Sequence, residues 1–129
     1  MNRLWYLIAG MFVGSIVNTG GAALASRVPT AQDSVQQSPG LYRVLLDNDE
    51  VRVLEYRLKP GEKEPLHAHP DGVVYGFNDS KIRVTSADGK VTESAGKAGD
   101  VFWRKSVTHA LENVGETDVH SLAVEIKRP

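Results

Sequence analysis

The sequence predicts an all-β protein built from antiparallel strands, arranged as a sandwich or a closed barrel. After residue 40, apolar and polar residues alternate with a period of two, which places successive side chains on opposite faces of a strand. Turn-forming clusters such as Pro60-Gly61 and Ala87-Asp88-Gly89 separate these runs at intervals of about 8 to 12 residues. No segment shows a sustained period of 3.6 residues or a capped helix, and the connections are too short for parallel crossovers.

The alternating segments are expected to form the strands. In the clearest of them, over residues 51–56, Arg52, Leu54 and Tyr56 share one face and the intervening residues share the other. The expected strands are 42–46, 51–56, 73–77, 81–85, 91–94, 101–103 and 119–127, with a further short strand that carries residues 67 and 69. A domain of about 90 residues is small for such a fold. Its sheets must therefore bury one face efficiently or associate with a second subunit.

Composition narrows the possible functions. The 129 residues suit one domain, and 15 basic and 16 acidic side chains are scattered along the chain, giving a net charge of −1. Without a cationic stripe, the chain is not expected to bind nucleic acid. The absence of cysteine excludes disulfides, thiolate nucleophiles and cysteine-ligated zinc. Any metal ion must therefore be held by nitrogen and oxygen ligands.

The first 25 residues have the features of a secretory signal peptide with a helical apolar region. A positive start at Arg3 precedes an uncharged stretch over residues 4–17, and Ala23 and Ala25 form a small-x-small cleavage site. We therefore expect cleavage before Ser26, a periplasmic or secreted location, and no membrane association after cleavage. A core helix would show a polar face, which this stretch lacks. An uncleaved membrane anchor remains the alternative.

Residues 26–40 are rich in Ser, Gln, Thr, Ala and Pro and carry almost no large apolar side chain. Such a composition is typical of a mobile linker. The sequence thus predicts a signal peptide over 1–25, a flexible linker over 26–40 and a single β-barrel domain over 41–129.

Histidines carry the clearest chemical signal. His67 and His69 are two residues apart, so on a strand their side chains leave the same face and their imidazoles converge. His109 follows much later, after the apolar segment 101–103, and reaches the same point only if the sheet closes on itself. A barrel provides that closure.

These residues also resemble a known family. The run Gly61-x5-His67-x-His69 before Val73-Val74-Tyr75, followed by Gly99-x9-His109-x3-Asn113, is similar to the two sequential motifs of the cupin superfamily. The resemblance spans residues 41–127 and implies a jelly-roll barrel. In that family, two histidines and a glutamate of the first motif and one histidine of the second bind a divalent metal ion. By position, His67, His69 and His109 are the implied metal ligands.

The chain departs from the family pattern where the glutamate is expected. That position corresponds to Gly72, Val73 or Val74, and none of these is an acid. Asp71 is the nearest carboxylate, although an aspartate in a Pro-Asp-Gly turn is common for local reasons. The second motif also has Lys105 and Val107 in place of its usual proline and glycine.

Three imidazoles with an open position suffice to bind zinc, iron, manganese, nickel or copper. Without the glutamate, we expect the ion to keep its full charge, to bind more weakly, and to attract anionic ligands such as carboxylates.

Each polar residue also has a structural interpretation. His67 and His69 are alternatively an exposed pair in a loop, and Asn113 anchors the end of a strand. His120, in phase with residues 122, 124 and 126, fits a hydrogen-bonded core histidine, with a role as a fourth ligand as the alternative. Residues 62–64, Glu-Lys-Glu, have the composition of a solvated loop.

Two functions are consistent with this sequence, and no catalytic residue is identified. The first is an exported cupin that binds a divalent metal ion and a small-molecule ligand inside its barrel. The second is a metal-dependent enzyme of the oxygenase or isomerase type that acts on a small oxygenated substrate. Cupins that resemble this chain often pair through edge strands, so the resemblance implies a homodimer.

Overall fold

The structure, a computed structural model, describes residues 31–128. The predicted signal peptide and its cleavage site lie outside these residues. The elements are α1 (Ser34–Gln37), the 3-10 helix η1 (Pro39–Leu41), β1 (Tyr42–Asp47), β2 (Val51–Leu58), β3 (Lys63–His69), β4 (Gly72–Gly76), β5 (Ser80–Ser86), β6 (Val91–Gly96), β7 (Val101–Arg104), β8 (Val107–Asn113) and β9 (Val119–Ile126). Among residues 31–128, no helix is long and apolar enough to cross a membrane.

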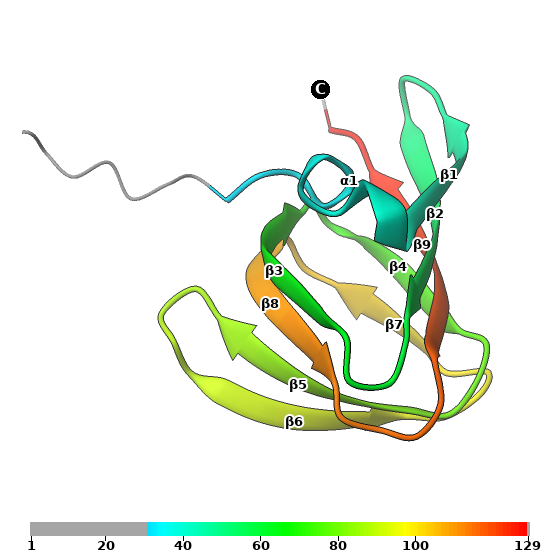
Figure 1. Cartoon of the computed structure of the whole chain (residues 1–129). Helices are drawn as coiled ribbons and strands as arrows, with labels where there is room; N and C mark the ends of the chain where they lie inside the picture. Colours follow the sequence, from blue (N-terminus) through cyan, green and yellow to red (C-terminus); the bar gives the residue numbers. More distant parts are fainter. Residues whose placement is uncertain (1–30, 129) are drawn as a thin grey trace, which may run out of the picture.

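The strands form two sheets that face each other (Figure 1). The larger sheet has the strand order β1-β2-β9-β4-β7, and the smaller has the order β3-β8-β5-β6. All pairings between these strands are antiparallel, and the chain crosses repeatedly from one sheet to the other. This connectivity is that of a jelly roll. The all-β antiparallel barrel predicted from the sequence is confirmed.

Strand β8 is absent from the strands that the alternation predicts. It pairs with β3 on one side and β5 on the other, so it lies in the middle of the smaller sheet. Val107, His109, Leu111 and Asn113 do share one face, but two of these four residues are polar. The hydrophobic pattern is consequently too weak to predict the strand.

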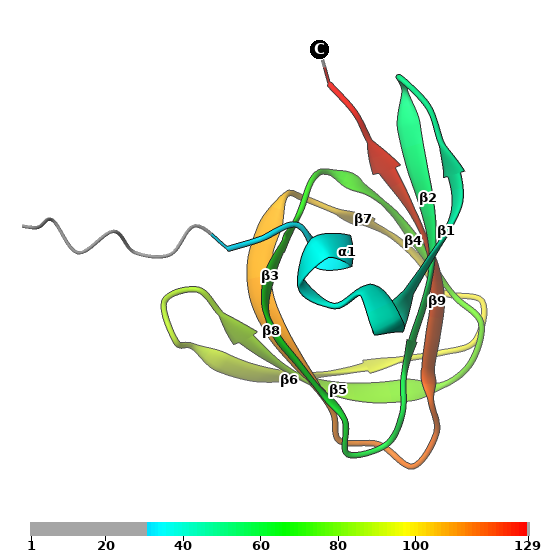
Figure 2. The ribbon, with the colours of Figure 1, turned by 45° about the horizontal axis from the view of Figure 1, so that its top comes forward.

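The segment before β1 differs from its prediction. The sequence assigns residues 26–40 to a flexible linker and predicts no capped helix, yet α1 begins at Ser34. The Asp33 carboxylate accepts a hydrogen bond from the Val35 backbone N–H, which caps the helix. Figure 2 shows α1 across one end of the barrel, between β3 and the β1–β2 pair. The folded domain therefore begins before residue 41.

The apolar core consists of two small clusters between the sheets. Leu54, Val74 and Ala123 form one, against which Val35 of α1 packs. Tyr56, Leu58 and Val119 form the other. Much of the remaining interior is polar: the buried residues also include Glu64, His67, His69, Asn113 and Glu125. A polar interior in a small barrel indicates a site, because buried polar groups contribute little stability by themselves.

One row of residues across the larger sheet organises this interior. In the backbone register, Arg52 of β2 lies opposite Glu125 of β9, and Glu125 lies opposite Gly72 of β4. Gly72 in turn lies opposite Arg104 of β7. Gly72 lies where β4 approaches β9 closely, because a Cβ there would be 2.4 Å from the Val124 carbonyl oxygen. The backbone thus excludes any side chain at one of the positions expected for the family glutamate.

Gly72→Ala is expected to lower the free energy of unfolding by about 1–3 kcal/mol, because the β4 and β9 backbones must separate to admit the methyl group. Gly40→Ala is the matched control, since a Cβ at Gly40 meets no described atom within 4 Å. Urea unfolding of both variants measures the difference. Equal stability of the two variants would contradict the close approach.

Candidate metal centre

The three histidines singled out by the sequence converge inside the barrel. His67 and His109 are direct cross-strand partners on β3 and β8, and His69 follows His67 on the same face of β3. The ring centroid of His67 lies 4.7 Å from the ring centroid of His69 and 4.8 Å from that of His109. Their ligand nitrogens all lie within 4.8 Å of one another. The predicted convergence is observed, and the alternative of an exposed loop pair is wrong for the buried His67 and His69.

The free nitrogens of these rings suit a metal ion. The Nε2 atoms of His67 and His109 are buried and have no hydrogen-bond partner among the described residues. An unpaired polar atom in a protein interior is costly, so two of them facing a common cluster require a physical reason. A divalent ion held by imidazole nitrogens supplies one. The donor set therefore fits such an ion.

The opposite nitrogens of the first two rings are fixed by protein acceptors. His67 Nδ1 lies 2.8 Å from the Pro65 carbonyl oxygen, and His69 Nδ1 lies 2.9 Å from Oε1 of Glu125. When each Nδ1 carries the proton, each Nε2 presents its lone pair to the cluster. A carboxylate or carbonyl behind a ligating histidine is the usual way to fix its tautomer and orientation.

Burial keeps two of the imidazoles in the neutral form that ligation requires. Burial, reinforced by the neighbouring His67 and His69, lowers the pKa of His109 to about 3. Burial also lowers the pKa of His69, against the opposing effect of its hydrogen bond to Glu125. Both rings are therefore uncharged at neutral pH.

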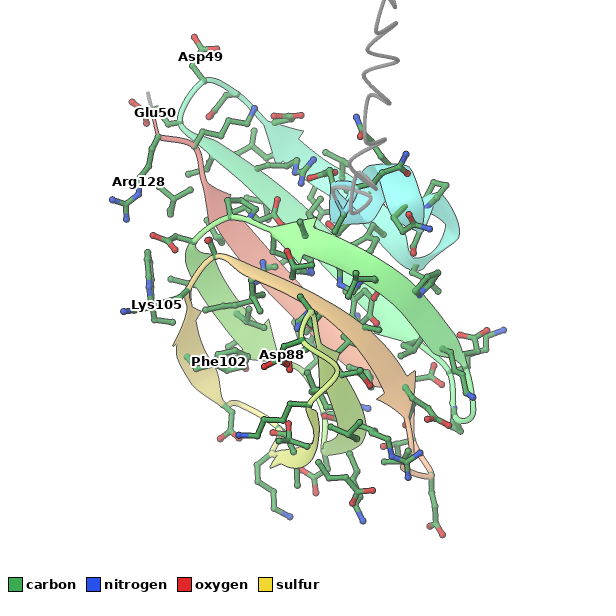
Figure 3. All side chains as sticks on the ribbon, turned by 90° about the vertical axis from the view of Figure 1, so that its left-hand side faces the viewer. Asp49, Glu50, Asp88, Phe102, Lys105 and Arg128 are labelled. Carbon is green, nitrogen blue, oxygen red and sulfur yellow. The ribbon has the colours of Figure 1, made fainter. Side chains whose placement is uncertain are left out.

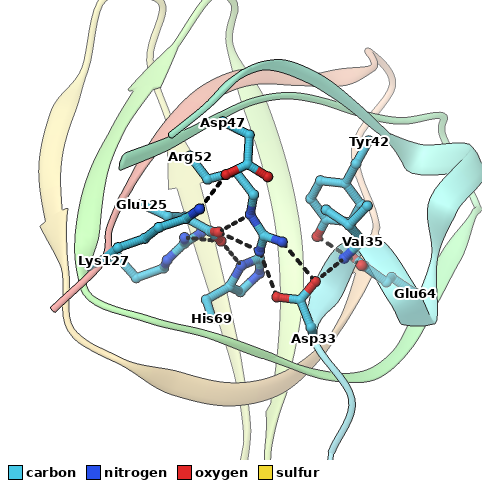
Figure 4. Close-up of polar contacts among 10 residues, drawn as sticks. Asp33, Val35, Tyr42, Asp47, Arg52, Glu64, His69, Glu125 and Lys127 are labelled. Carbon is cyan, nitrogen blue, oxygen red and sulfur yellow. Dashed lines mark hydrogen bonds and ion pairs between the residues drawn. The ribbon is translucent and has the colours of Figure 1, made fainter. Parts of the chain in front are cut away.

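Glu125 connects His69 to the rest of the fold (Figure 4). Its carboxylate accepts hydrogen bonds from His69 and from Arg52, whose Nε lies 2.8 Å from Oε2. Arg52 also donates to both carboxylate oxygens of Asp33, the residue that caps α1. Burial acts to raise the pKa of the Glu125 carboxyl, but the hydrogen bonds from His69 and Arg52 lower it below its usual value. Glu125 is accordingly a buried anion that orients His69.

Glu64 lies behind His67. Its carboxyl accepts hydrogen bonds from the hydroxyls of Tyr42 and Tyr56, each at 2.8 Å, and Oε1 lies 3.4 Å from His67 Nδ1. Burial raises the pKa of this carboxyl. The expectation of a solvated loop over residues 62–64 is wrong at Glu64, which is 1% exposed.

A bulge in β3 explains the position of Glu64. On a regular strand, residues three apart point to opposite faces. Here Glu64 pairs with Leu111 while His67 pairs with His109, so three steps on β3 match two steps on β8. The extra residue rotates the strand and brings both side chains to the interior.

A cavity of about 630 Å³ adjoins the histidines. His69, His109, Tyr42, Tyr56 and Arg104 supply polar groups to its wall. Its apolar lining includes Val74, Ile82, Val84, Leu111, Val119 and Ala123. The lining extends to the edge strands β6 and β7, and Phe102 of β7 is labelled in Figure 3. The cavity therefore combines an apolar body with a few polar groups, as small-molecule sites do.

Other polar residues considered from the sequence lie outside the cluster. Asp71 accepts hydrogen bonds from the Ser106 backbone N–H and from Arg128, so it joins its turn to segments distant in the sequence; it lies outside the histidine cluster and does not replace the family glutamate. Asn113 donates to the carbonyl oxygens of Leu58 and Thr117, which anchors the end of β8.

His120 is hydrogen-bonded as expected, through Nε2 to Glu55 at 2.9 Å. Its assignment to the core is wrong. Along β9, Val119, Ala123 and Glu125 are the buried residues, whereas His120 and the residues in phase with it are only half-buried. It is also absent from the cluster of ligand nitrogens, so it is not a fourth ligand.

Four further residues of the site were not predicted from the sequence: Glu64, Glu125, Arg52 and Arg104. For Arg52 and Glu125 a signal existed, because each occupies the same face of its strand as buried apolar residues. A charged residue in phase with a core face indicates a buried, paired charge. For Glu64 the bulge breaks the alternation, so no such signal was present.

Solved structures share this architecture. A cupin domain from Bordetella pertussis Tohama I superposes with a TM-score of 0.63 at 25% sequence identity, over 77% of this chain and 98% of that one. An RmlC-like cupin family protein from Methanocaldococcus jannaschii gives 0.54 at 16% identity, over 67% and 78% of the two chains. A polyketide cyclase from Streptomyces resistomycificus gives 0.51 at 19% identity, over 67% and 64%.

No protein-family model and no curated protein matches the sequence. The assignment therefore rests on the paired histidine motifs, the jelly-roll topology and the structural neighbours. The neighbours at 16% and 19% identity bear on the fold alone, whereas the Bordetella domain is matched over nearly its whole length. These observations agree, and the chain is a member of the cupin superfamily.

Proposed function

We propose that the protein is an exported cupin that binds a divalent metal ion through His67, His69 and His109 and a small molecule in the adjoining cavity. The observation that carries the proposal is the pair of buried, unpartnered Nε2 atoms of His67 and His109 within a cluster of three imidazoles. Neutral imidazole is a common ligand of zinc, iron, nickel and copper. The chain's own contribution is to fix the orientation of two of the rings, through Pro65 and Glu125. A bound ion would supply Lewis-acid polarisation of a ligand oxygen.

Export stays a prediction from residues 1–25, which lie outside the described part of the chain. The small folded domain and the cysteine-free composition are compatible with the periplasm or the extracellular space.

A second candidate function is metal-dependent catalysis on a small oxygenated substrate. The observation in its favour is that the hydroxyls of Tyr42 and Tyr56, which line the cavity, both donate to the buried Glu64 carboxyl. Such an arrangement connects the cavity to a carboxyl of raised pKa. The polyketide cyclase among the structural neighbours shares only the fold with this chain.

We also propose a homodimer. β7 is an edge strand that pairs only with β4 in its sheet, and it exposes Val101, Phe102 and Trp103, each at least 50% exposed. Exposed apolar side chains on an unpaired edge are a frequent site of association.

Metal binding is expected to require the three histidines. Protein purified without chelators and titrated with zinc, iron, manganese, nickel and copper should retain one equivalent of an ion, whereas His67→Ala and His109→Ala should retain none. His120→Ala is the matched control, because His120 lies outside the cluster and should leave stoichiometry unchanged. Elemental analysis gives the result. A wild-type protein that retains none of the five ions would refute the site.

The metal-free protein is expected to lose stability in acid because of His109. Its folded-state pKa is about 3, against about 6.5 for free imidazole, so between these values the unfolded chain binds the additional proton. Stability should fall as the pH drops through this window, by up to about 1.4 kcal/mol per pH unit. His109→Asn should reduce the slope of stability from pH 7 to 4.5, measured by urea unfolding in the presence of a chelator. Identical slopes in the two proteins would contradict the assigned burial effect.

Substitution of the β7 edge is expected to shift the oligomeric state. Val101→Lys places a charge on the edge strand without altering a cavity residue, so sedimentation should show a dimer for the wild type and a monomer for the variant. Val91→Lys, on the exposed edge strand β6, is the control and should remain dimeric. A monomeric wild type at high concentration would overturn the dimer.

A further inference from the structure

Two arginines lie in the barrel interior, and their surroundings differ. The Arg52 guanidinium makes four hydrogen bonds, to both oxygens of Asp33 and to Oε2 of Glu125. The Arg104 side chain is equally protected, at 15% exposure against 17% for Arg52. Yet among the described residues its only hydrogen bond is a long one of 3.4 Å from Nη2 to Glu125 Oε1. Its Nε is buried without any partner.

Glu125 cannot satisfy Arg104 fully. One of its oxygens is engaged by Arg52 and the other by His69 at 2.9 Å, so both are taken by shorter contacts. Gly72, which lies between Glu125 and Arg104 in the row across the sheet, has no side chain to offer an acceptor. A buried guanidinium with unused donors is an unfavourable arrangement unless a ligand completes it.

Arg104 lines the cavity together with His69 and His109, two of the three proposed metal ligands. Burial lowers the pKa of the Arg104 guanidinium, and the nearby Glu125 carboxylate offsets this effect only in part. The charges of Arg52 and Arg104 are balanced by the carboxylates of Asp33 and Glu125, so a bound divalent ion would leave this region net positive.

We propose that the cavity binds a small carboxylic acid with an apolar body, whose carboxylate is held by the Arg104 guanidinium beside the metal site. A planar guanidinium fork with free donors matches a carboxylate. The apolar lining of Val74, Ile82, Leu111 and Ala123 suits the rest of such a molecule. The proposal names the ligand class of the cavity described above and thus rests on the proposed function.

The probes are benzoate and its neutral isostere benzamide, titrated calorimetrically into zinc-loaded and chelator-treated protein. Benzoate should bind the wild type at least about tenfold more tightly than benzamide, the difference typical of a hydrogen bond to a charged group. Arg104→Gln should abolish this preference, and Arg104→Lys should retain part of it because the charge remains without the fork. Arg57→Gln is the matched control, since Arg57 is an exposed arginine outside the cavity lining, and it should behave as the wild type.

The comparison of zinc-loaded with chelator-treated protein separates a failure of the carboxylate site from a failure of the metal site. If zinc fails to bind while the benzoate preference still depends on Arg104, the metal proposal falls and the carboxylate site stands. If zinc binds but wild-type protein does not discriminate benzoate from benzamide, the carboxylate site is refuted. A preference that survives in a folded Arg104→Gln variant refutes it equally. The wild-type comparison decides the matter even if Arg104→Gln does not fold.

Discussion

The buried carboxylate of Glu125 is the contact on which the rest of the structure depends. It accepts hydrogen bonds from His69 of the smaller sheet and from Arg52 of the larger one. Arg52 also donates a hydrogen bond to Asp33 at the start of α1. One anion therefore links the two sheets, the helical cap of the barrel and a proposed metal ligand. Removing either partner of such a pair leaves a buried charge uncompensated, at a cost of several kcal/mol. The polar network consequently sets a single relative position for these elements.

The interior of this small domain contains as many polar groups as apolar ones. Its apolar core is limited to two three-residue clusters, whereas three imidazoles, two carboxyls and two guanidinium groups share the space beside them. Most of these polar groups have hydrogen-bond partners. The exceptions among them are the unused donors of Arg104 and the unpartnered Nε2 atoms of His67 and His109. These unsatisfied groups are where the fold has left room for ligands. A scaffold optimised only for stability would have filled the positions with apolar residues.

The sequence predicted the features that follow from strict periodicity. The two-residue spacing of His67 and His69 placed both rings on one face, and closure of the barrel brought His109 to them. It could not predict Glu64, because the β3 bulge turns the side chain inward against the alternation. It placed residues 26–40 in a linker because composition does not reveal the Asp33 cap or its pairing with an arginine from β2. The row that joins Arg52, Glu125, Gly72 and Arg104 depends on strand order, which no local pattern contains.

The departure from the cupin motif has a structural counterpart. A Cβ at Gly72 would meet the β9 backbone, and the β9 residue paired with Gly72 is Glu125, whose carboxylate accepts a hydrogen bond from His69 Nδ1. The carboxylate thus acts on the ring and leaves the ion with three nitrogen ligands. An anomalous difference map from crystals of the zinc-loaded protein tests this account most directly. It predicts one peak about 2.1 Å from the Nε2 atoms of His67, His69 and His109, with Glu125 still bonded to His69 Nδ1. A peak bonded to the Glu125 carboxylate, or none at the histidines, would contradict it.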